Sequence, residues 1–511
     1  MTTQHTATPA APTRTVQIDV HDLNTQVLDR IAAGARFASL YATASRQDEG
    51  TRLSAVLVRD GHTTILDADL PTDENTYPSL TAELPAAFWY ERQIHDLFGL
   101  MPAGHPRLDP LVLPLPAGTK RPRPGSRYAA TNRLVPDELA LPRRVIGKGM
   151  FTIPHGPVRS GVFESVEYLV ETPGEDVAHI QVRVYAKHRG IDKRFEALDP
   201  VTGILLAERV EGIASIAHAL AYAHAVETIA GFTPPPAAGY VRVLHAELER
   251  IANHLDVTMR LCDAAGLAVA TSRFAWHKER TLRLTGALCD SRFGRGVITP
   301  GGIHRLPLIA PETVLTELAA VAKVLTADAE LLMTTSSFLD RLRGTGVLDP
   351  ALAAAHGALG PVGRASGMHD DVRITRPYDA YPQLPLPVPK RHETADALAR
   401  TRIRFDEIDA SIDLVRRSLE ALANLTVERP GDLHAPLPAG LDGRALGWVE
   451  APQGELLYAL DLADGRIVRC APRTASFHNL VLFHETFHTD ILTDFPFIEA
   501  SFALSIAGVA N

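Results

Sequence analysis

Residues 241–266 read VRVLHAELERIANHLDVTMRLCDAAG, and this stretch decides the fold of the larger part of the chain. Leu244, Leu248, Ile251 and Leu255 follow one another at steps of four, three and four residues. This spacing puts apolar side chains on one face of an α-helix. The sequence therefore predicts a long helix that buries this face against neighbouring elements.

Further helices are predicted on both sides of this stretch, and together they are numerous enough to bury a shared core as a bundle. Strand patterns flank the helical part, and Asp464-Gly465 supplies the positive-φ positions of a tight hairpin in the later one. The predicted helices are 205–230, 270–292, 312–339 and 396–424; the strand patterns are MFTIPHGPV (150–158), SVEYLVETP (165–173), VAHIQVRVYA (177–186) and residues 445–470.

The first part of the chain predicts a small α+β domain. A helix over 24–34 precedes two strands joined at Asp60-Gly61, and a further helix starts near Phe88 and ends at Gly99. Proline-rich residues then break the pattern, because proline sustains neither a helix nor a central strand. The predicted organisation is a disordered tail (1–15), an α+β domain (16–112), an extended linker (113–145) and a helical-bundle domain with peripheral β-structure (146–511).

Composition narrows the class of protein. The chain has 511 residues, 46% of them hydrophobic, with a net charge of −9, which argues against a nucleic-acid partner. No apolar stretch reaches the roughly 18 residues of a membrane span, and the N-terminus lacks the apolar region of a secretory signal. The three cysteines form no CxxC pair, so this chain alone is not expected to hold a four-thiolate cluster. We expect a cytoplasmic protein.

Two short motifs have ordinary interpretations. HETFH (484–488) matches H-E-x-x-H, in which two histidines one turn apart bind zinc and the glutamate acts as base. Zinc needs a third protein ligand, and the sequence offers Glu499; the favoured interpretation is the polar face of a late helix. GKGMF (147–151) lacks the third glycine of a phosphate loop, so we predict a turn and no nucleotide site.

Charged residues gather in three places on predicted helices or after a strand. They are KHRGIDKRFEA (187–197), with Gly190 allowing a sharp turn; Glu247, Arg250 and His254; and Glu208, Arg209 and Glu211 at the start of the 205–230 helix. Buried charges need partners. Interhelical ion-pair networks are the favoured interpretation, and a functional site is the alternative.

Seven blocks of sequence resemble a known family. FWYERQIHDLFGLMPAGHPRLDPLVLP (88–114) resembles the small peripheral subunit of respiratory complex I. Six later blocks resemble, in order, the quinone-site subunit of complex I, and more closely the large subunit of energy-converting [NiFe]-hydrogenases of the formate hydrogenlyase type. These blocks are IPHGPVRSG, YAKHRGIDKRFE, AERVEGIASIAHALAYAHAVE, YVRVLHAELERIANHL, RFGRGVITPGGI and GWVEAPQGELLYAL. The resemblance implies both modules fused on one chain and an α+β fold with a hydrogenase-large-subunit-like bundle.

The chain departs from the family at the metal. The family's first pair of nickel ligands lies in AERxCGxC, where Glu211 and Ala214 occupy the thiolate positions. The second pair lies in DPCxxC near the C-terminus, where this chain reads DFPFIEASF (494–502). Soft thiolates suit nickel and iron, and neither a carboxylate nor a methyl group replaces them. We therefore predict a variant without a nickel–iron centre and without hydrogenase activity of its own.

The family's quinone-binding residues also differ. Arg159 and Phe163 stand where the complex I motif has two histidines, and Gly212 stands at the quinone-binding tyrosine. Phenyl and glycine side chains donate no hydrogen bond to a quinone carbonyl. Quinone binding in the family's pose is therefore not expected, although a quinone remains a candidate ligand of a differently lined cavity.

The resemblance places six residues around the family's cavity, as candidates for a proton-conducting or redox-coupled network. They are Arg159, His188, Arg189, Glu211, Glu450 and Asp494. A relic cavity filled by salt bridges is the alternative.

The resemblance implies a subunit of a membrane-associated oxidoreductase related to NADH-quinone oxidoreductase and energy-converting hydrogenases. It would take part in electron transfer coupled to proton or ion movement and would hold no cofactor itself. The implied partners are a small iron–sulfur subunit with the nearest cluster, a ferredoxin-like subunit and antiporter-like membrane subunits. These would hold it on the inner face of the cell membrane. A non-catalytic scaffold of the same complex and, more remotely, a zinc hydrolase using HETFH are the competing hypotheses.

Overall fold

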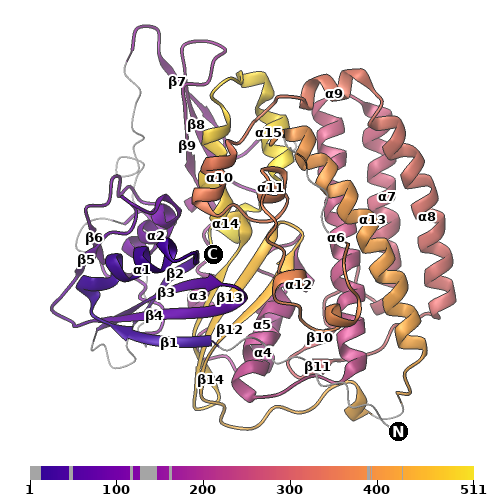
Figure 1. Cartoon of the computed structure of the whole chain (residues 1–511), viewed down its shortest axis with the longest axis horizontal. Helices are drawn as coiled ribbons and strands as arrows, with labels where there is room; N and C mark the ends of the chain where they lie inside the picture. Colours follow the sequence, from indigo (N-terminus) through magenta and orange to yellow (C-terminus); the bar gives the residue numbers. More distant parts are fainter. Residues whose placement is uncertain are drawn as a thin grey trace.

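The computed structural model describes residues 13–44, 50–115, 119–126, 147–159, 164–387, 392, 394–427 and 430–511. A small β-rich N-terminal domain lies beside a larger, mainly helical body (Figure 1). The predicted α+β class is therefore confirmed. Within these residues, no helix combines the length and the apolar character that crossing a bilayer requires.

The N-terminal domain is built on a four-stranded sheet in the order β1-β4-β3-β2. Asp60 and Gly61 join β3 to β4 with φ values of 49° and 77°, so the predicted tight hairpin is confirmed. Strand β1 begins at Thr13, which places the last three residues of the expected 1–15 tail in the sheet; residues 1–12 lie outside the described part. The elements are β1 (Thr13–Ile18), α1 (Leu23–Ala32), β2 (Arg36–Ala44), β3 (Thr51–Arg59), β4 (His62–Leu70), β5 (Thr76–Pro78), α2 (Phe88–Phe98) and β6 (Met101–Ala103).

Helix α2 anchors the chain that leaves this domain. One oxygen of the buried Asp96 carboxylate accepts hydrogen bonds from the backbone N–H groups of Leu111, Val112 and Leu113, at 2.7, 2.8 and 3.1 Å. Leu113 and Leu115 are buried, so the start of the predicted 113–145 linker packs on the domain. Residues 116–118 and 127–145 of that linker lie outside the described part.

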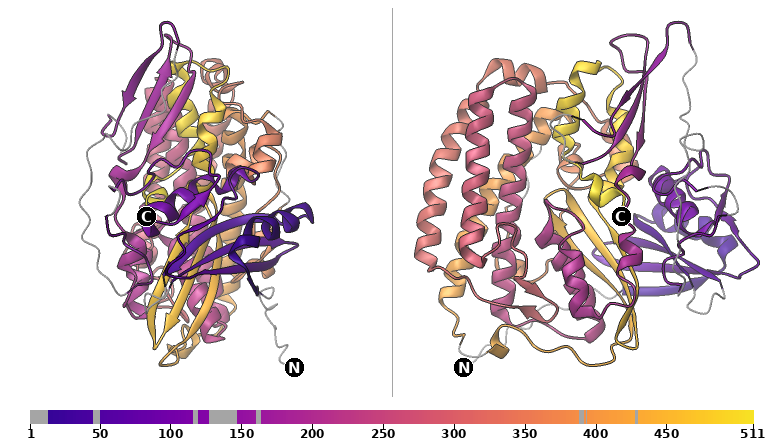
Figure 2. Two further views of the ribbon diagram at one scale, coloured as in Figure 1. Left: turned by 90° about the vertical axis from the view of Figure 1, so that its left-hand side faces the viewer. Right: turned by 180° about the vertical axis from the view of Figure 1, so that it is seen from behind.

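Long helices form the body, as their apolar periodicity predicts. Helices α6, α7, α8 and α13 lie side by side (Figures 1 and 2). The predicted 312–339 helix is interrupted after Leu332, and a shorter helix follows. The elements are α6 (Pro236–Ala264), α7 (Ala268–Cys289), α8 (Pro311–Leu332), α9 (Ser336–Leu342) and α13 (Ala397–Ala423).

The predicted helix over 205–230 is wrong as a single helix. It is divided into α4 (Pro200–Ala207) and α5 (Ser215–Ala230), and residues 208–214 connect them. The Glu208 carboxylate accepts a 2.6 Å hydrogen bond from the backbone N–H of Gly296, far along the chain. A tertiary contact therefore holds this connection outside the helical conformation, although the local sequence favours a helix.

A second sheet joins the body to the N-terminal domain. Strands β12 (Gly443–Ala451), β13 (Gly454–Ala463) and β14 (Arg466–Arg473) are antiparallel, with the predicted turn at Asp464-Gly465. Helix α5 packs closely on β12, and Gly447 permits this contact because it has no side chain. A Cβ at this position would overlap the carbonyl oxygen of Ala221. The N-terminal sheet shares an apolar cluster with these strands, which includes Tyr41, Val56, Ile65, Leu446, Leu457 and Ala459.

Ion pairs and hydrogen bonds reinforce the contact between the two parts. The buried Glu455 carboxylate contacts three guanidinium groups, those of Arg36 at 2.6 Å, Arg376 at 2.7 Å and Arg473. Arg36 belongs to the N-terminal domain, so this cluster crosses the domain contact. The Tyr90 hydroxyl adds a 2.9 Å hydrogen bond to Nδ1 of His478.

The remaining elements complete the body. A three-stranded antiparallel sheet, β7-β8-β9, extends along one edge of it (Figure 2). The elements are β7 (Phe151–His155), β8 (Glu167–Thr172), β9 (His179–Arg183), α3 (Ile191–Arg194), β10 (Ile298–Thr299), β11 (Gly302–Ile303), α10 (Pro350–His356), α11 (Gly360–Ala365), α12 (Val372–Thr375), α14 (Ala475–Asn479), α15 (Phe495–Phe502) and α16 (Ile506–Val509), with 3₁₀ helices at Val20–Asp22, Pro85–Ala87, Tyr185–Lys187, Tyr381–Gln383, Pro430–Asp432, Leu480–Thr486 and Leu492–Asp494.

Candidate functional site

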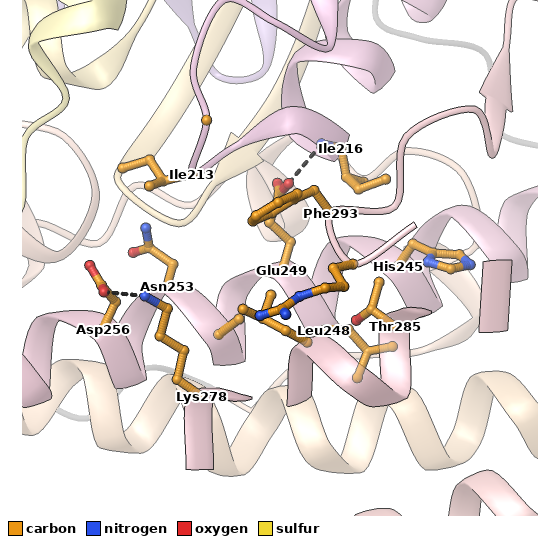
Figure 3. A pocket seen from close by; sticks show the side chains of 14 residues that line it. Ile213, Ile216, His245, Leu248, Glu249, Asn253, Asp256, Lys278, Thr285 and Phe293 are labelled. Atoms are coloured by element: carbon orange, nitrogen blue, oxygen red, sulfur yellow. Dashed lines mark hydrogen bonds and ion pairs between the residues drawn. The ribbon is translucent and has the colours of Figure 1, made fainter. Parts of the chain in front are cut away.

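A pocket of about 90 Å³ lies between helices α6 and α7 and the connecting segment that carries Gly212 and Ile213 (Figure 3). Its walls are mainly apolar, and a few polar groups converge on it, as in many ligand sites. Phe293 stands at the pocket with 46% of its surface exposed. The lining residues are Gly212, Ile213, Ile216, His245, Leu248, Glu249, Ala252, Asn253, Asp256, Lys278, Leu282, Thr285, Arg292 and Phe293.

Glu249 points from α6 towards the first turn of α5. Its carboxylate oxygens accept hydrogen bonds from the backbone N–H groups of Ile216, at 2.7 Å (Figure 3), and Ala217, at 3.0 Å. Burial raises the pKa of Glu249 to about 8, and the nearby Glu211 carboxylate adds to the rise, against the effect of the two N–H groups. A carboxyl group with this pKa exchanges its proton near neutral pH.

Glu211 lies behind the wall of the pocket. Its side chain is 2% exposed, and one carboxylate oxygen lies 3.6 Å from Nε2 of His218. The other oxygen has no hydrogen-bond partner within the described residues and faces Gly508. Buried polar groups normally have hydrogen-bond partners, so this unpartnered oxygen is unusual.

His218 continues from Glu211 into the core. Its Nδ1 lies 2.7 Å from the hydroxyl of Tyr458, and both side chains are fully buried. The hydroxyl fixes the orientation of the ring and turns Nε2 towards Glu211. Glu211, His218 and Tyr458 therefore form a file of buried side chains, in which a hydrogen bond joins His218 to Tyr458 and 3.6 Å separates His218 from Glu211.

His188 and Arg189 contact the C-terminal residues 507–511 and hold them next to Glu211. Arg189 donates hydrogen bonds to the carbonyl oxygens of Val210, at 2.6 Å, and Ala507, at 3.0 Å. His188 contacts the backbone of Ala510 and Asn511, and burial lowers its pKa. The short helix α16 is thereby fixed over Glu211.

Arg159 and Asp494 have other partners. Arg159 forms a bidentate ion pair with Glu499, at 2.6 and 3.0 Å, and lies over the ring of Tyr168. Asp494 forms a 3.3 Å ion pair with Arg341 on the surface. Phe163, predicted at one histidine position, lies outside the described residues.

Glu450 belongs to a buried ion cluster. Its carboxylate accepts hydrogen bonds from Arg364, at 2.9 Å, and from the backbone N–H of Val372, at 3.1 Å. Burial and the nearby Asp371 carboxylate raise the pKa of Glu450 to about 7. The cluster also contains Glu247, Arg250, His254, Asp371, Arg373 and Glu407.

The structure thus brings Arg189 to the backbone next to Glu211. His188 contacts the last residues of the chain, which cover Glu211. It places Arg159, Glu450 and Asp494 in separate contacts. Sequence reasoning missed Glu249, His218 and Tyr458. Local spacing carries no signal for Tyr458, because a hairpin sheet 240 residues later delivers it to His218.

The residues present do not fit a nickel–iron centre. Glu211 and Ala214 stand where the resemblance to the hydrogenases implies the first thiolate pair, and residues 494–502 contain no cysteine. Cys262, Cys289 and Cys470 are buried free thiols. Burial raises the pKa of Cys262 to about 12 and also raises that of Cys470, which disfavours the thiolate that a metal requires.

HETFH does not form the helical zinc motif. Its first three residues end a 3₁₀ helix, Leu480–Thr486, and His488 lies beyond it, so the predicted late α-helix is wrong at this position. Glu485 instead pairs with His484 at 2.7 Å and with His488 at 3.5 Å. The candidate third ligand, Glu499, is paired with Arg159. In the part of the chain that the structure describes, no three His, Cys, Asp or Glu side chains are grouped to hold a metal ion.

Comparisons with known proteins agree with this architecture. The model of the respiratory-chain NADH dehydrogenase 30 Kd subunit matches residues 15–122, and that of the 49 Kd subunit matches residues 266–439. Formate hydrogenlyase subunit 5 of Escherichia coli K12 is 27% identical over 450 residues, 85% of this chain and 76% of that protein. The carbon monoxide-induced hydrogenase of Rhodospirillum rubrum is 30% identical over 312 residues, 61% of this chain and 85% of that protein. An NADH-quinone oxidoreductase C/D subunit of Cereibacter sphaeroides is 28% identical over 459 residues, 80% of this chain and 77% of that protein.

Proposed function

Because the chain belongs to the family in which the 30 Kd and 49 Kd subunits of respiratory-chain NADH dehydrogenase are fused, with homology to membrane-bound hydrogenases, we propose a function within such a complex. The chain is a peripheral subunit of a membrane-associated, complex-I-like oxidoreductase. It couples electron arrival from a partner subunit to proton or ion movement, and it holds no nickel–iron centre.

The environment of Glu211 carries this proposal. A carboxylate stands at a thiolate position of the related hydrogenases, 2% exposed, next to His218 and in line with Tyr458. A buried carboxylate beside a histidine responds to a nearby change of charge by taking up or releasing a proton. An electron that arrives on a neighbouring cluster is such a change.

The partners in the proposal follow from the family. A small iron–sulfur subunit would present the nearest cluster, a ferredoxin-like subunit would deliver electrons, and antiporter-like membrane subunits would move the ion. The chain would sit on the cytoplasmic side of the membrane through these partners. A quinone remains a proposed ligand; Gly212, at the position of the family's tyrosine, offers it no side-chain donor.

The scaffold function is the second candidate, and the ion clusters favour it. The Glu455 and Glu450 clusters stabilise the fold and give the chain a rigid surface for partners without any chemistry.

Substitution of Glu211 in the intact complex separates the two functions. One-electron reduction of the purified complex by a photoreductant is followed with a pH-indicator dye. We expect the redox-linked proton uptake of the wild type to be lost in Glu211→Ala and Glu211→Gln. The control is Glu317→Gln. Glu317 is an exposed glutamate on α8 that pairs with Arg280 of α7. Unchanged proton uptake in an assembled Glu211→Ala complex would contradict the coupling function and support the scaffold function.

A further inference from the structure

The wall that separates the pocket from Glu211 is one short segment of backbone. Gly212 and Ile213, the two residues after Glu211, line the pocket, and so does Ile216. Gly212 is exposed and has open space where a Cβ would stand. Glu211 is therefore the chain neighbour of a residue that lines a space that solvent enters.

Glu249 bridges this wall from the other side. Its carboxylate ends at the N–H groups of Ile216 and Ala217, in the first turn of α5, which directly follows the connection that carries Glu211. It lines the pocket, whereas Glu211 does not. The electrostatic repulsion between the two carboxylates is strong enough to contribute to the raised pKa of Glu249.

The other charged groups at the pocket have partners of their own. Lys278 pairs with Asp256 at 2.6 Å, and Arg292 pairs with Glu279 at 2.6 Å. Arg250, next to Glu249 on α6, faces the Glu247 and Glu407 carboxylates. His245 is buried, and its lowered pKa keeps it neutral near pH 7. Of the two carboxyl groups that line the pocket, Asp256 is paired with a lysine. Glu249 accepts hydrogen bonds from backbone N–H groups and from no cationic side chain of the described residues.

A further polar group points to occupancy of the pocket by hydrogen-bonding molecules. The Oδ1 atom of Asn253, one turn from Glu249 on α6, is buried without a hydrogen-bond partner among the described residues, and the side chain is 6% exposed. A space of about 90 Å³ with polar groups on its wall is large enough for ordered water. Water that enters the pocket would satisfy Asn253 and reach Glu249.

We propose that Glu249 is the proton-exchange residue that connects the solvent-accessible pocket with the buried carboxylate of Glu211. The proposal rests on the proposed function and assigns a residue that the function did not include. In the forward step the O–H bond of neutral Glu249 breaks and its proton moves to the Glu211 carboxylate. Glu249, now an anion, takes a proton from a hydronium ion or a protonated buffer molecule that reaches it from solvent, which leaves neutral water or the buffer base in the pocket. His218 and Tyr458 extend the file beyond Glu211.

The test uses the same photoreduction of the purified complex, with the rate and the amplitude of proton uptake read separately. Glu249→Gln keeps the size of the side chain and one of its two hydrogen-bonding oxygens but has no carboxyl proton to give up. We expect the amplitude to be retained and the rate to fall at least tenfold. Formic acid, in equilibrium with added formate, is small enough for a pocket of about 90 Å³, so formate should restore the rate, and Glu249→Asp should retain most of it.

The outcomes separate this proposal from the function on which it rests. A wild-type rate in Glu249→Gln would overturn the route, whereas loss of amplitude in Glu211→Ala supports the proposed function independently. Loss of amplitude in Glu249→Gln would show that Glu249 is the terminal proton site, and it too would overturn the route. Glu317→Gln should match the wild type in both quantities, and intact assembly is verified by gel filtration.

Discussion

Glu211 and Gly508 illustrate how one residue sets the environment of another. A carboxylate buried with an unpaired oxygen costs free energy, of about 1–3 kcal/mol for an unsatisfied group. The backbone of Gly508 closes directly over that oxygen, and Arg189 fixes the neighbouring carbonyl of Ala507. The last turn of the chain therefore seals the space in which Glu211 sits.

We expect Gly508→Ala to destabilise the protein, because a Cβ at this position would overlap the Glu211 carboxylate. Overpacking of a buried site costs about 1–3 kcal/mol, and chemical denaturation measures it. Gly212→Ala is the matched control, because no atom lies within 4 Å of its Cβ position. An equal loss of stability in both variants would contradict this account of the seal.

At the scale of elements, the sequence predicts the long helices well and the connections poorly. The apolar stripes of α6 and α13 gave their position within a few residues, and Asp60-Gly61 and Asp464-Gly465 gave two hairpins. The break between α4 and α5 was not predictable, because a contact between Glu208 and Gly296 stabilises it across 88 residues.

The candidate site was only partly predictable from the sequence, because it too depends on contacts between residues that are separated in the chain. Glu211 stood out through its position in a motif, whereas Glu249 lies on a helix among other charged residues. The role of Glu249 depends on which backbone N–H groups its carboxylate contacts. That contact, with the start of α5, forms between residues 33 positions apart in the chain and has no signature in local spacing.

The attachment of the segment after α2 depends on one side chain. Asp96→Asn retains the size of the side chain but replaces a carboxylate that accepts three backbone N–H groups. We expect a loss of about 1–3 kcal/mol in the free energy of unfolding and faster proteolysis after residue 113. Asp73→Asn, at an exposed position, should change neither. Equal proteolysis of the two variants would show that other contacts hold this segment.

At the scale of the whole molecule, the two family modules behave as one packed unit. The N-terminal sheet and the β12–β14 sheet share an apolar cluster, and the Glu455 carboxylate draws arginines from both parts. Although burial opposes the charge, the guanidinium groups of Arg36, Arg473 and Arg376 hold the pKa of Glu455 well below its usual range.

Glu455→Gln should weaken the contact between the two parts, because it leaves three guanidinium groups without their shared carboxylate. Breaking a buried pair costs about 3–5 kcal/mol, measurable by thermal unfolding at pH 7. The lowered pKa stabilises the folded state above the pKa of the unfolded chain, about 4.3, and this contribution is lost as the pH falls through the folded value. The wild type should therefore lose stability in acid more steeply than the variant. Parallel acid profiles for the two proteins would contradict this, and Glu83→Gln, an exposed substitution, is the control.

The packing of the two sheets has a consequence for biogenesis. Because the modules are synthesised as one polypeptide, they are delivered to the complex in a fixed one-to-one ratio, whatever the expression level. The encounter between them is intramolecular, and it needs no separate bimolecular step. Dilution in the cell therefore cannot separate them, and neither module waits as an orphan for the other.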